Sequence, residues 1–265
     1  MNFWNQSKNN IYVAAHRGLS AKYPENTLEA FKAAIDAGVD QIETDVRCSK
    51  DGVLVLIHDE TVDRTTDGTG FVKDKTYSEL AVLEAGAIKN VTGYKIPTLR
   101  ELMELVKDHP TITLDIELKV YPNENQEKYA YEVCDKTLAM IDEYGFTDRI
   151  VVNSFHSGLL EYVNKKHPGK YKFHVYYPHN RNISPTIFPY SYAYCSCMFR
   201  EQENEIMASK EIFDIMIKNG VQPWAGASVK DEQTVDIAIQ RGAYLITCNN
   251  PDEILKILKA KGYHE

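Results

Sequence analysis

The 265-residue sequence predicts a TIM (β/α)8 barrel with a small insertion between its second strand and the helix that follows. Apolar strand-like runs alternate with helical segments, which implies right-handed βαβ units and a parallel sheet. Nine strands can be counted, but one is the return strand of a hairpin, which leaves eight parallel units. We expect a single domain over 1–265, with 47–95 as an insertion within it. The alternative is an open doubly wound sheet, which no glycine-rich phosphate loop supports.

The chain begins with an apolar strand over 11–15, followed by a helix over 24–38. Asn26 is the predicted N-cap of this helix, and Glu29 is its capping-box partner three residues later. Gly38 ends the helix. These start and stop signals fix the helix between the first two strands.

The stretch 41–59, with the sequence QIETDVRCSKDGVLVLIHD, predicts a strand, a tight Asp-Gly turn and a returning strand. With a two-residue loop, Asp45 would lie directly opposite His58. Glu43 would share the face of Asp45, because the two are separated by one residue on a strand. Turn geometry therefore predicts that two carboxylates and an imidazole meet at one place.

Beyond a turn-rich segment that ends near residue 95, helices and strands alternate regularly. The predicted helices span 97–108, 126–144, 157–166, 203–219, 231–241 and 252–261. The predicted strands span 111–118, 149–155, 171–177, 192–199, 221–227 and 243–248. Only the connection at 184–189 reads poorly as a helix.

Composition limits the classes of function. A net charge of -8 argues against broad nucleic-acid binding and suits a protein that holds a cation. The sequence has no apolar run long enough to anchor it in a membrane, and its N-terminus lacks the pattern of a signal peptide. Five cysteines without a Cys-x-x-Cys motif indicate a reduced, cytoplasmic chain. The oligomeric state is unknown from the sequence.

Strands covered on both faces should read as nearly continuous apolar runs, and two predicted strands depart from this rule. Glu43 and Asp45 share one face of the second strand, and Glu117 lies on a charged face of the strand over 111–118. The apolar faces must meet the helices, so the charged faces turn toward the barrel axis. TIM-barrel enzymes place their active sites near this axis, at the C-terminal ends of the strands.

Three carboxylates at one place require compensation. Two unit charges about 4 Å apart repel by roughly 4 kcal/mol at an effective dielectric constant near 20. All-oxygen ligands favour a hard divalent cation, Mg²⁺ or Ca²⁺, with Mn²⁺ also possible. We therefore predict that Glu43, Asp45 and Glu117 bind one divalent cation.

Imidazole and cationic side chains are predicted at the same mouth. His16 ends the first strand and His58 ends the hairpin return, so the pair is interpreted as general acid and base. Arg17 and Lys119 supply the charge that an anionic substrate would need. In the alternative interpretation, the histidines are structural and Arg17, Arg47 and Lys119 neutralise the carboxylates without a metal.

These residues fall within ordered motifs that span nearly the first half of the chain. The motifs are HRG at 16–18, PENT at 24–27, IETDV at 42–46, KDGVLVLIHD at 50–59, DRTTDGTG at 63–70, IPTL at 96–99 and IELK at 116–119. Together they resemble the glycerophosphodiester phosphodiesterase family.

The resemblance implies a TIM barrel that hydrolyses glycerophosphodiesters, which are small molecules, to an alcohol and glycerol 3-phosphate. It implies a divalent metal on Glu43, Asp45 and Glu117, acid–base catalysis by His16 and His58, and phosphate binding by Arg17 and Lys119. Two alternatives remain open. One is phospholipase D-like cleavage of lysophospholipid or sphingolipid head groups, and the other is a barrel that binds phosphodiesters without catalysis.

The second half of the chain departs from the family pattern. Ala225-Gly226-Ala227 follows Trp224 where the family usually has Thr-Val-Asn, and Cys248 stands where the family has aspartate. His156 follows Ser154-Phe155 in place of an acidic or amide residue. Trp224 is predicted either as a wall of the substrate pocket or as a packing residue, and the loop over 176–194 is predicted at the mouth.

Overall fold

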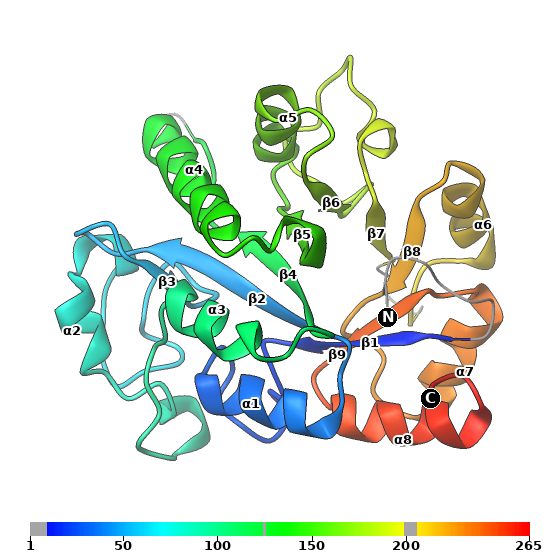
Figure 1. Cartoon of the computed structure of the whole chain (residues 1–265), viewed down its shortest axis with the longest axis horizontal. Helices are drawn as coiled ribbons and strands as arrows, with labels where there is room; N and C mark the ends of the chain where they lie inside the picture. Colours follow the sequence, from blue (N-terminus) through cyan, green and yellow to red (C-terminus); the bar gives the residue numbers. More distant parts are fainter. Residues whose placement is uncertain (1–9, 124–125, 199–205) are drawn as a thin grey trace.

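Eight parallel strands close into a barrel in a computed structural model that describes residues 10–123, 126–198 and 206–265 (Figure 1). The barrel strands are β1 (Tyr12–His16), β2 (Gln41–Cys48), β4 (Thr113–Leu118), β5 (Ile150–Asn153), β6 (Lys172–Val175), β7 (Cys195–Met198), β8 (Gln222–Ala225) and β9 (Leu245–Cys248). Strand β1 pairs in parallel with both β2 and β9, which closes the ring. The predicted TIM barrel is confirmed.

Helices surround the barrel and alternate with its strands (Figure 1). They are α1 (Leu28–Ala37), α3 (Leu99–Lys107), α4 (Glu127–Glu143), α5 (Ser157–Lys166), α6 (Lys210–Lys218), α7 (Glu232–Arg241) and α8 (Pro251–Lys261), with a 3-10 turn η3 (Thr147–Arg149) before β5. The poor connector after β6 is a loop with one 3-10 turn, η4 (Pro189–Ser191). Within the predicted strand over 192–199 and helix over 203–219, residues 199 and 203–205 lie outside the described residues.

The hairpin prediction was right in topology and wrong in register. Strand β3 (Leu54–Leu56) runs antiparallel to β2, as predicted. The loop has three residues, because Ser49 rather than Lys50 is the last residue of the first arm and its amide bonds the carbonyl of Val53 at 2.9 Å. Gly52 ends the loop in the left-handed region at φ 87°, as three-residue hairpin loops require. Asp45 therefore lies opposite Ile57, whose amide donates to its carbonyl, and not opposite His58.

The predicted N-cap of the first helix was also wrong. Thr27 caps α1, and its side chain accepts a hydrogen bond from the amide of Ala30. Asn26 precedes the cap in a left-handed conformation at φ 55°, which asparagine tolerates better than most residues. Its side chain is thereby free to turn away from the helix and toward β2. Gly38 ends α1 as predicted.

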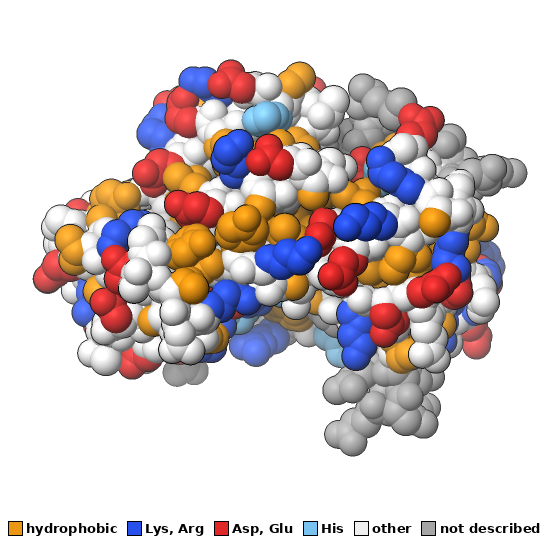
Figure 2. All heavy atoms as spheres, turned by 90° about the horizontal axis from the view of Figure 1, so that it is seen from below, with side chains coloured by type: hydrophobic (Ala, Val, Ile, Leu, Met, Phe, Trp, Pro, Cys, Tyr) orange, Lys and Arg blue, Asp and Glu red, His pale blue; other side chains and the backbone are white. Residues whose placement is uncertain are grey.

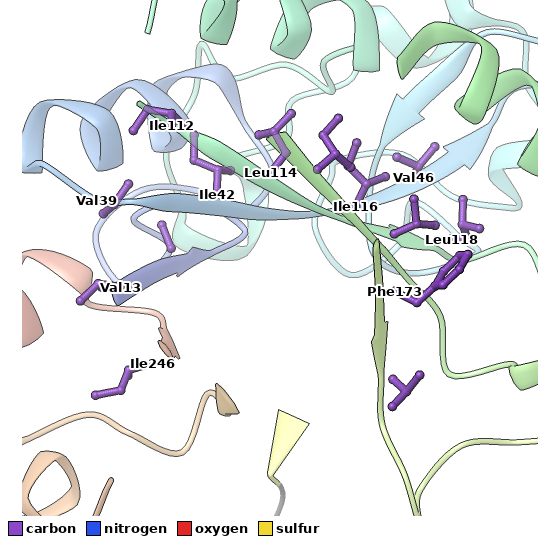
Figure 3. Packing of buried hydrophobic residues seen from close by; sticks show 14 of the residues in the cluster. Val13, Val39, Ile42, Val46, Ile112, Leu114, Ile116, Leu118, Phe173 and Ile246 are labelled. Carbon is purple, nitrogen blue, oxygen red and sulfur yellow. The ribbon is translucent and has the colours of Figure 1, made fainter. Parts of the chain in front are cut away.

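The two faces of the barrel strands bury different kinds of side chain. Ile42, Leu114 and Ile116 lie on the outer face of β2 and β4, where they pack against the helices (Figure 3). Inside the barrel, a separate apolar cluster comprises Tyr12, Ala14, Val151, Cys195, Trp224 and Leu245. The charged side chains of β2 and β4 share this interior, as the alternation of the sequence predicted.

The segment between β2 and α3 folds around a small core of its own. It contains β3, η1 (Val72–Asp74), α2 (Tyr77–Ala81) and η2 (Ala87–Lys89), and lies beside the outer end of β2 (Figure 1). Its buried apolar side chains are Val55, Ile57, Val62, Val72, Leu80, Ala85 and Ile96. A separate core lets this segment hold a fixed shape beside the barrel mouth.

The surface is mixed in charge. Over the face seen in Figure 2, basic and acidic side chains are interspersed with hydrophobic ones and form no continuous basic area. This agrees with the net charge of -8. Within the part of the chain that the structure describes, no helix combines the length and hydrophobicity needed to cross a membrane.

A matched pair of glycine variants tests how tightly the turn after β1 packs on α1. Gly18 and Gly38 both have positive φ, at 82° and 87°, but a Cβ on Gly18 would lie 2.6 Å from the carbonyl carbon of Ala30. Gly38 faces open space. In urea denaturation, Gly38→Ala should cost about 1–2 kcal/mol from the left-handed backbone alone, whereas Gly18→Ala should cost about 3 kcal/mol or more. Equal losses would contradict the close packing.

Candidate active site

Strand register brings the predicted metal ligands together at the C-terminal mouth of the barrel. Asp45 pairs with Glu117 across β2 and β4, and His16 pairs with Glu43 across β1 and β2. One carboxylate oxygen from each of Glu43, Asp45 and Glu117 lies within 4.8 Å of the others. All three side chains are buried. The alternation of polar and apolar residues thus predicted the correct face, although the hairpin register was off by one.

Two cations offset part of the negative charge of this carboxylate cluster. Lys119 Nζ lies 2.7 Å from Glu117 Oε1 and 3.4 Å from Asp45 Oδ1, and Arg17 Nε lies 3.1 Å from Asp45 Oδ2. Arg47 does not bind these carboxylates, and its Nε donates to the carbonyl of His58 at 2.9 Å. Among the residues that the structure describes, Arg47 forms no ion pair with the cluster, so Arg17 and Lys119 carry the compensation.

The three carboxylates differ in acidity because their surroundings differ. Burial alone would raise the pKa of Asp45, but Lys119 and Arg17 outweigh it and lower that pKa to about 2. Burial raises the pKa of Glu117 to about 7, despite the opposing charge of Lys119. Burial and the charge of Asp45 raise the pKa of Glu43 well above its ordinary value. Without a further cation, the cluster therefore retains protons near neutral pH.

Asn26 supports the cluster from the loop before α1. Its side-chain amide donates to Asp45 Oδ2 at 2.8 Å, and its carbonyl oxygen accepts from the Thr44 hydroxyl at 2.8 Å. It is 3% exposed, so these bonds are shielded from water. Sequence reasoning missed this role because it assigned Asn26 to the helix cap. Its place in the PENT motif was the available signal.

His16 is held in a neutral form beside the cluster. Its Nδ1 lies 2.6 Å from Asn249 Oδ1, and its Nε2 lies 3.9 Å from Glu43 Oε2. Because an amide oxygen only accepts hydrogen bonds, Nδ1 carries the proton and Nε2 is left as a base. Burial, with the charge of Arg17, lowers the pKa of His16 to about 4. Asn249 follows β9 directly and was not singled out from the sequence.

His58 is held in the same way by its neighbour in the chain. His58 Nδ1 lies 2.6 Å from Asp59 Oδ1, and Arg64 binds the other oxygen of Asp59 at 2.6 Å. Burial lowers the pKa of His58, and the nearby charge of Asp45 opposes this change. His58 and Lys119 line one cavity, and Lys119 contacts Asp45, so His58 reaches the surroundings of the cluster although it is not opposite Asp45 on the hairpin.

A chain of ion pairs links the two histidine-bearing elements. Glu25 binds Arg17 at 2.9 Å and Arg64 at 2.7 Å, and Arg64 binds Asp59. Sequence reasoning had singled out Arg17 in this chain but missed Glu25, Asp59 and Arg64. All three occur in motifs quoted above, and Glu25 and Asp59 adjoin Asn26 and His58, whose roles were predicted.

Trp224 lies away from the mouth. Its side chain is fully buried in the interior apolar cluster, its Nε1 donates to Gln222 at 3.2 Å, and its ring centroid lies 5.0 Å from that of His174. His174 in turn contacts Asp115 at 2.7 Å. This position supports packing, the second of the two predicted roles. The first role, a wall of the substrate pocket, has no support from its position.

A cavity of about 650 Å³ opens beside the carboxylate cluster, and we call it the mouth cavity. Its wall is formed by Arg47, Cys48, His58, Asp59, Glu60, Phe71, Val72, Lys73, Lys119, Val120, Tyr121, Asn123, Gln126, Tyr129, Phe155 and Arg181. Arg181 comes from the loop after β6, which was predicted to reach the mouth. The cavity has the size of a small-molecule binding site.

The donor set suits a hard divalent cation. Asp45 Oδ1 is buried and has no hydrogen-bond partner among the described residues, although Lys119 lies nearby. Three carboxylate oxygens already converge around it. All-oxygen ligands are those that Mg²⁺, Ca²⁺ and Mn²⁺ prefer, so the residues present fit such an ion.

A closed β/α barrel with its ionisable groups gathered at the C-terminal mouth places the chain among the TIM-barrel enzymes. Residues 16–254 match the sequence model of the Glycerophosphoryl diester phosphodiesterase family. The chain belongs to this family, as its motifs predicted.

Known relatives are similar to this chain over nearly its whole length. A glycerophosphodiester phosphodiesterase from Caldanaerobacter subterraneus subsp. tengcongensis is 34% identical over 258 residues, covering 94% of this chain and 98% of the relative. A solved candidate glycerophosphoryl diester phosphodiesterase from Silicibacter pomeroyi shares the fold with a TM-score of 0.85 and 22% identity, covering 98% and 97%. An Oleispira antarctica phosphodiesterase, solved with its product sn-glycerol-3-phosphate, has a TM-score of 0.76 and 22% identity, covering 94% and 96%.

Lys119→Met tests whether Lys119 compensates the carboxylate cluster. Without a metal, the change leaves buried carboxylates unpaired and should lower the free energy of unfolding by about 3–5 kcal/mol. In the folded protein the pKa of Glu117 is raised from its ordinary value of 4.5 to about 7. Glu117 is therefore mostly ionised at pH 8 and mostly protonated at pH 5, so the loss of free energy of unfolding in the variant should be larger at pH 8. Urea denaturation with a chelator measures this. The control Lys32→Met, in an exposed pair with Asp36, should cost under about 0.5 kcal/mol.

Proposed function

We propose that this protein hydrolyses glycerophosphodiesters to an alcohol and glycerol 3-phosphate, using one divalent cation and two histidines. The observation that carries the proposal is the convergence of Glu43, Asp45 and Glu117 beside two imidazoles held through Nδ1. Membership of the family supports the reaction, and the product bound by the Oleispira relative supports the glycerol 3-phosphate half of the substrate.

Glu43, Asp45 and Glu117 would hold the ion, Mg²⁺ or Ca²⁺, with Mn²⁺ as the third candidate. Such a cation supplies Lewis-acid stabilisation of charge on the phosphoryl oxygens and orients the ester. Arg17 and Lys119 now pair with these carboxylates. An ion bound to the carboxylates would neutralise them and so free Arg17 and Lys119. We propose that these two side chains then bind the phosphate.

The two histidines divide the proton transfers. As the nucleophile attacks phosphorus, one neutral imidazole takes its proton. The bond from phosphorus to the alcohol oxygen breaks while the other histidine, which enters the step as an imidazolium, protonates the leaving oxygen. Asn249 and Asp59 orient His16 and His58 through Nδ1, so each would present Nε2 to the substrate. The nucleophile is water, or the adjacent glycerol hydroxyl acting through a cyclic phosphate.

We further propose that residues 1–265 act as one barrel domain in which 47–95 is an insertion that carries His58 to the site. Cytoplasmic location stays a prediction from the reduced cysteines and the sequence composition. The alternatives differ in the alcohol or in turnover. Cleavage of lysophospholipid or sphingolipid head groups would use the same site, and a binding barrel would retain affinity without hydrolysis.

Removal of the metal tests the role of the carboxylate cluster. Chelation should lower turnover of glycerophosphodiesters by about 10²-fold or more, because a Lewis-acid cation contributes several kcal/mol. Mg²⁺, Ca²⁺ and Mn²⁺ are then restored one at a time, and calorimetry measures ion binding independently of activity. Glu43→Gln should weaken ion binding, whereas the exposed control Glu104→Gln on α3 should not. Turnover that ignores chelation would refute the metal site.

Histidine variants test the acid–base pair. His16→Ala and His58→Ala should each lower kcat by about 10²–10⁴-fold with little change in KM, because proton transfer matters in the transition state rather than in binding. His109→Ala, before β4 and at the opposite end of that strand from Glu117, is the matched control. Near-normal kcat in either variant would remove that histidine from the pair. Binding of every diester without cleavage would favour the binding barrel instead.

A further inference from the structure

The mouth cavity lies next to the proposed reaction centre and so offers a place for the alcohol half of the substrate. His58 and Lys119 belong both to its wall and to the surroundings of the carboxylate cluster. Tyr121 continues from this cluster into the cavity, because its hydroxyl lies 3.3 Å from Glu117 Oε1. A phosphodiester bound at the cluster would therefore direct one of its two alcohols into the cavity.

Cationic side chains from three separate elements line the cavity. Arg47 comes from β2, Lys73 from η1 and Arg181 from the loop after β6. Within residues 10–123, 126–198 and 206–265, none of these three forms an ion pair with a carboxylate. Arg47 bonds the carbonyl of His58, and Lys73 Nζ lies 3.4 Å from the side-chain oxygen of Gln126. None of the three is therefore held in a direct ion pair, although the charges of Asp45, Glu60 and Asp59 act on Arg47 from a longer distance.

The acidic residues of the cavity wall do not offset these charges. Asp59 is bound by Arg64 and His58. Glu60 is exposed and is the other acidic side chain among the lining residues that the structure describes. The cavity therefore combines three available cations with one available carboxylate, and its charge favours an anion.

Four aromatic rings of the described residues line the cavity, and three of them have a protein cation over one face. Lys73 Nζ lies 5.9 Å from the ring centroid of Phe71, and the Arg181 guanidinium lies 5.8 Å from that of Tyr121. Lys119 Nζ lies 5.8 Å from the ring centroid of Phe155. A quaternary ammonium would need such ring faces for cation–π contact, and it would meet a like charge at three of the four rings. The walls therefore disfavour a choline-like head group.

We propose that the mouth cavity selects glycerophosphodiesters whose alcohol carries a second anionic group, a phosphate or a carboxylate, which Arg47, Lys73 and Arg181 bind. This inference rests on the proposed hydrolysis and adds its substrate class. Arginine binds such groups through paired hydrogen bonds, and lysine binds them as a point charge. Arg47 also holds the carbonyl of His58, so the exposed residues Lys73 and Arg181 are the better positions for variants.

The test compares diesters of glycerol 3-phosphate that differ only in the released alcohol. The alcohols are glycerol, glycerol bearing a phosphate on its far hydroxyl, glyceric acid and choline. We expect kcat/KM to be at least about tenfold higher for the phosphate-bearing or the carboxylate-bearing alcohol than for glycerol, and lowest for choline. The two anionic arms show which group the cavity prefers. A preference for choline, or equal rates with all four alcohols, would overturn the proposal while leaving hydrolysis intact.

The double variant Lys73→Gln with Arg181→Gln shows whether these cations cause the preference. The ratio of kcat/KM between the preferred anionic alcohol and glycerol should fall about tenfold, whereas Lys32→Gln on the exposed face of α1 should leave the ratio unchanged. An unchanged ratio in the double variant would refute the assignment. If none of the diesters is cleaved, the proposed hydrolysis fails, and calorimetric titration with the same four compounds decides the cavity preference by affinity.

Discussion

Buried negative charge at the barrel mouth is the constraint on which the rest of the structure depends. Three carboxylates within 4.8 Å of one another would repel strongly in a site shielded from water. Arg17 and Lys119 offset this repulsion, and Asn26 donates a further hydrogen bond to Asp45. The side chains of Arg17 and Asn26 reach the carboxylates because the backbone turns sharply where they are attached. These turns are the left-handed turn at Arg17 and Gly18 and the left-handed Asn26.

Strand register turns this constraint into a site. Parallel pairing of β2 with β4 places Asp45 beside Glu117, and pairing of β1 with β2 places His16 beside Glu43. His58 cannot be placed by a further parallel strand, because β2 already pairs with β1 on one edge and with β4 on the other. The chain instead extends β2 beyond the barrel and returns through β3, which brings His58 back to the mouth.

The sequence predicted the barrel, the polar faces and the meeting of Glu43, Asp45 and Glu117 because each follows from a local pattern. Successive side chains of a strand point to opposite faces, so the alternation of charged and apolar residues assigns Glu43, Asp45 and Glu117 to the inner face. Loop length is less well specified, because Asp51-Gly52 suits both two-residue and three-residue turns, and the wrong choice shifted the hairpin register by one. Asn26 was misjudged because its role depends on contacts distant in the chain, and the sequence left two roles open for Trp224 for the same reason. The residues around Asn26 are as compatible with a helix cap as with the contact to Asp45 that the structure shows.

The segment between β2 and α3 separates two tasks along its length. Residues 58–64 are fastened to the barrel, because Asp59 and Arg64 join the ion-pair chain through Glu25. Residues 71–73 contribute to the cavity wall and lie on the segment's own small core. Changes in the second stretch can therefore reshape the cavity while His58 stays anchored. If the cavity selects the alcohol as proposed, this division lets the choice of alcohol evolve independently of the position of His58.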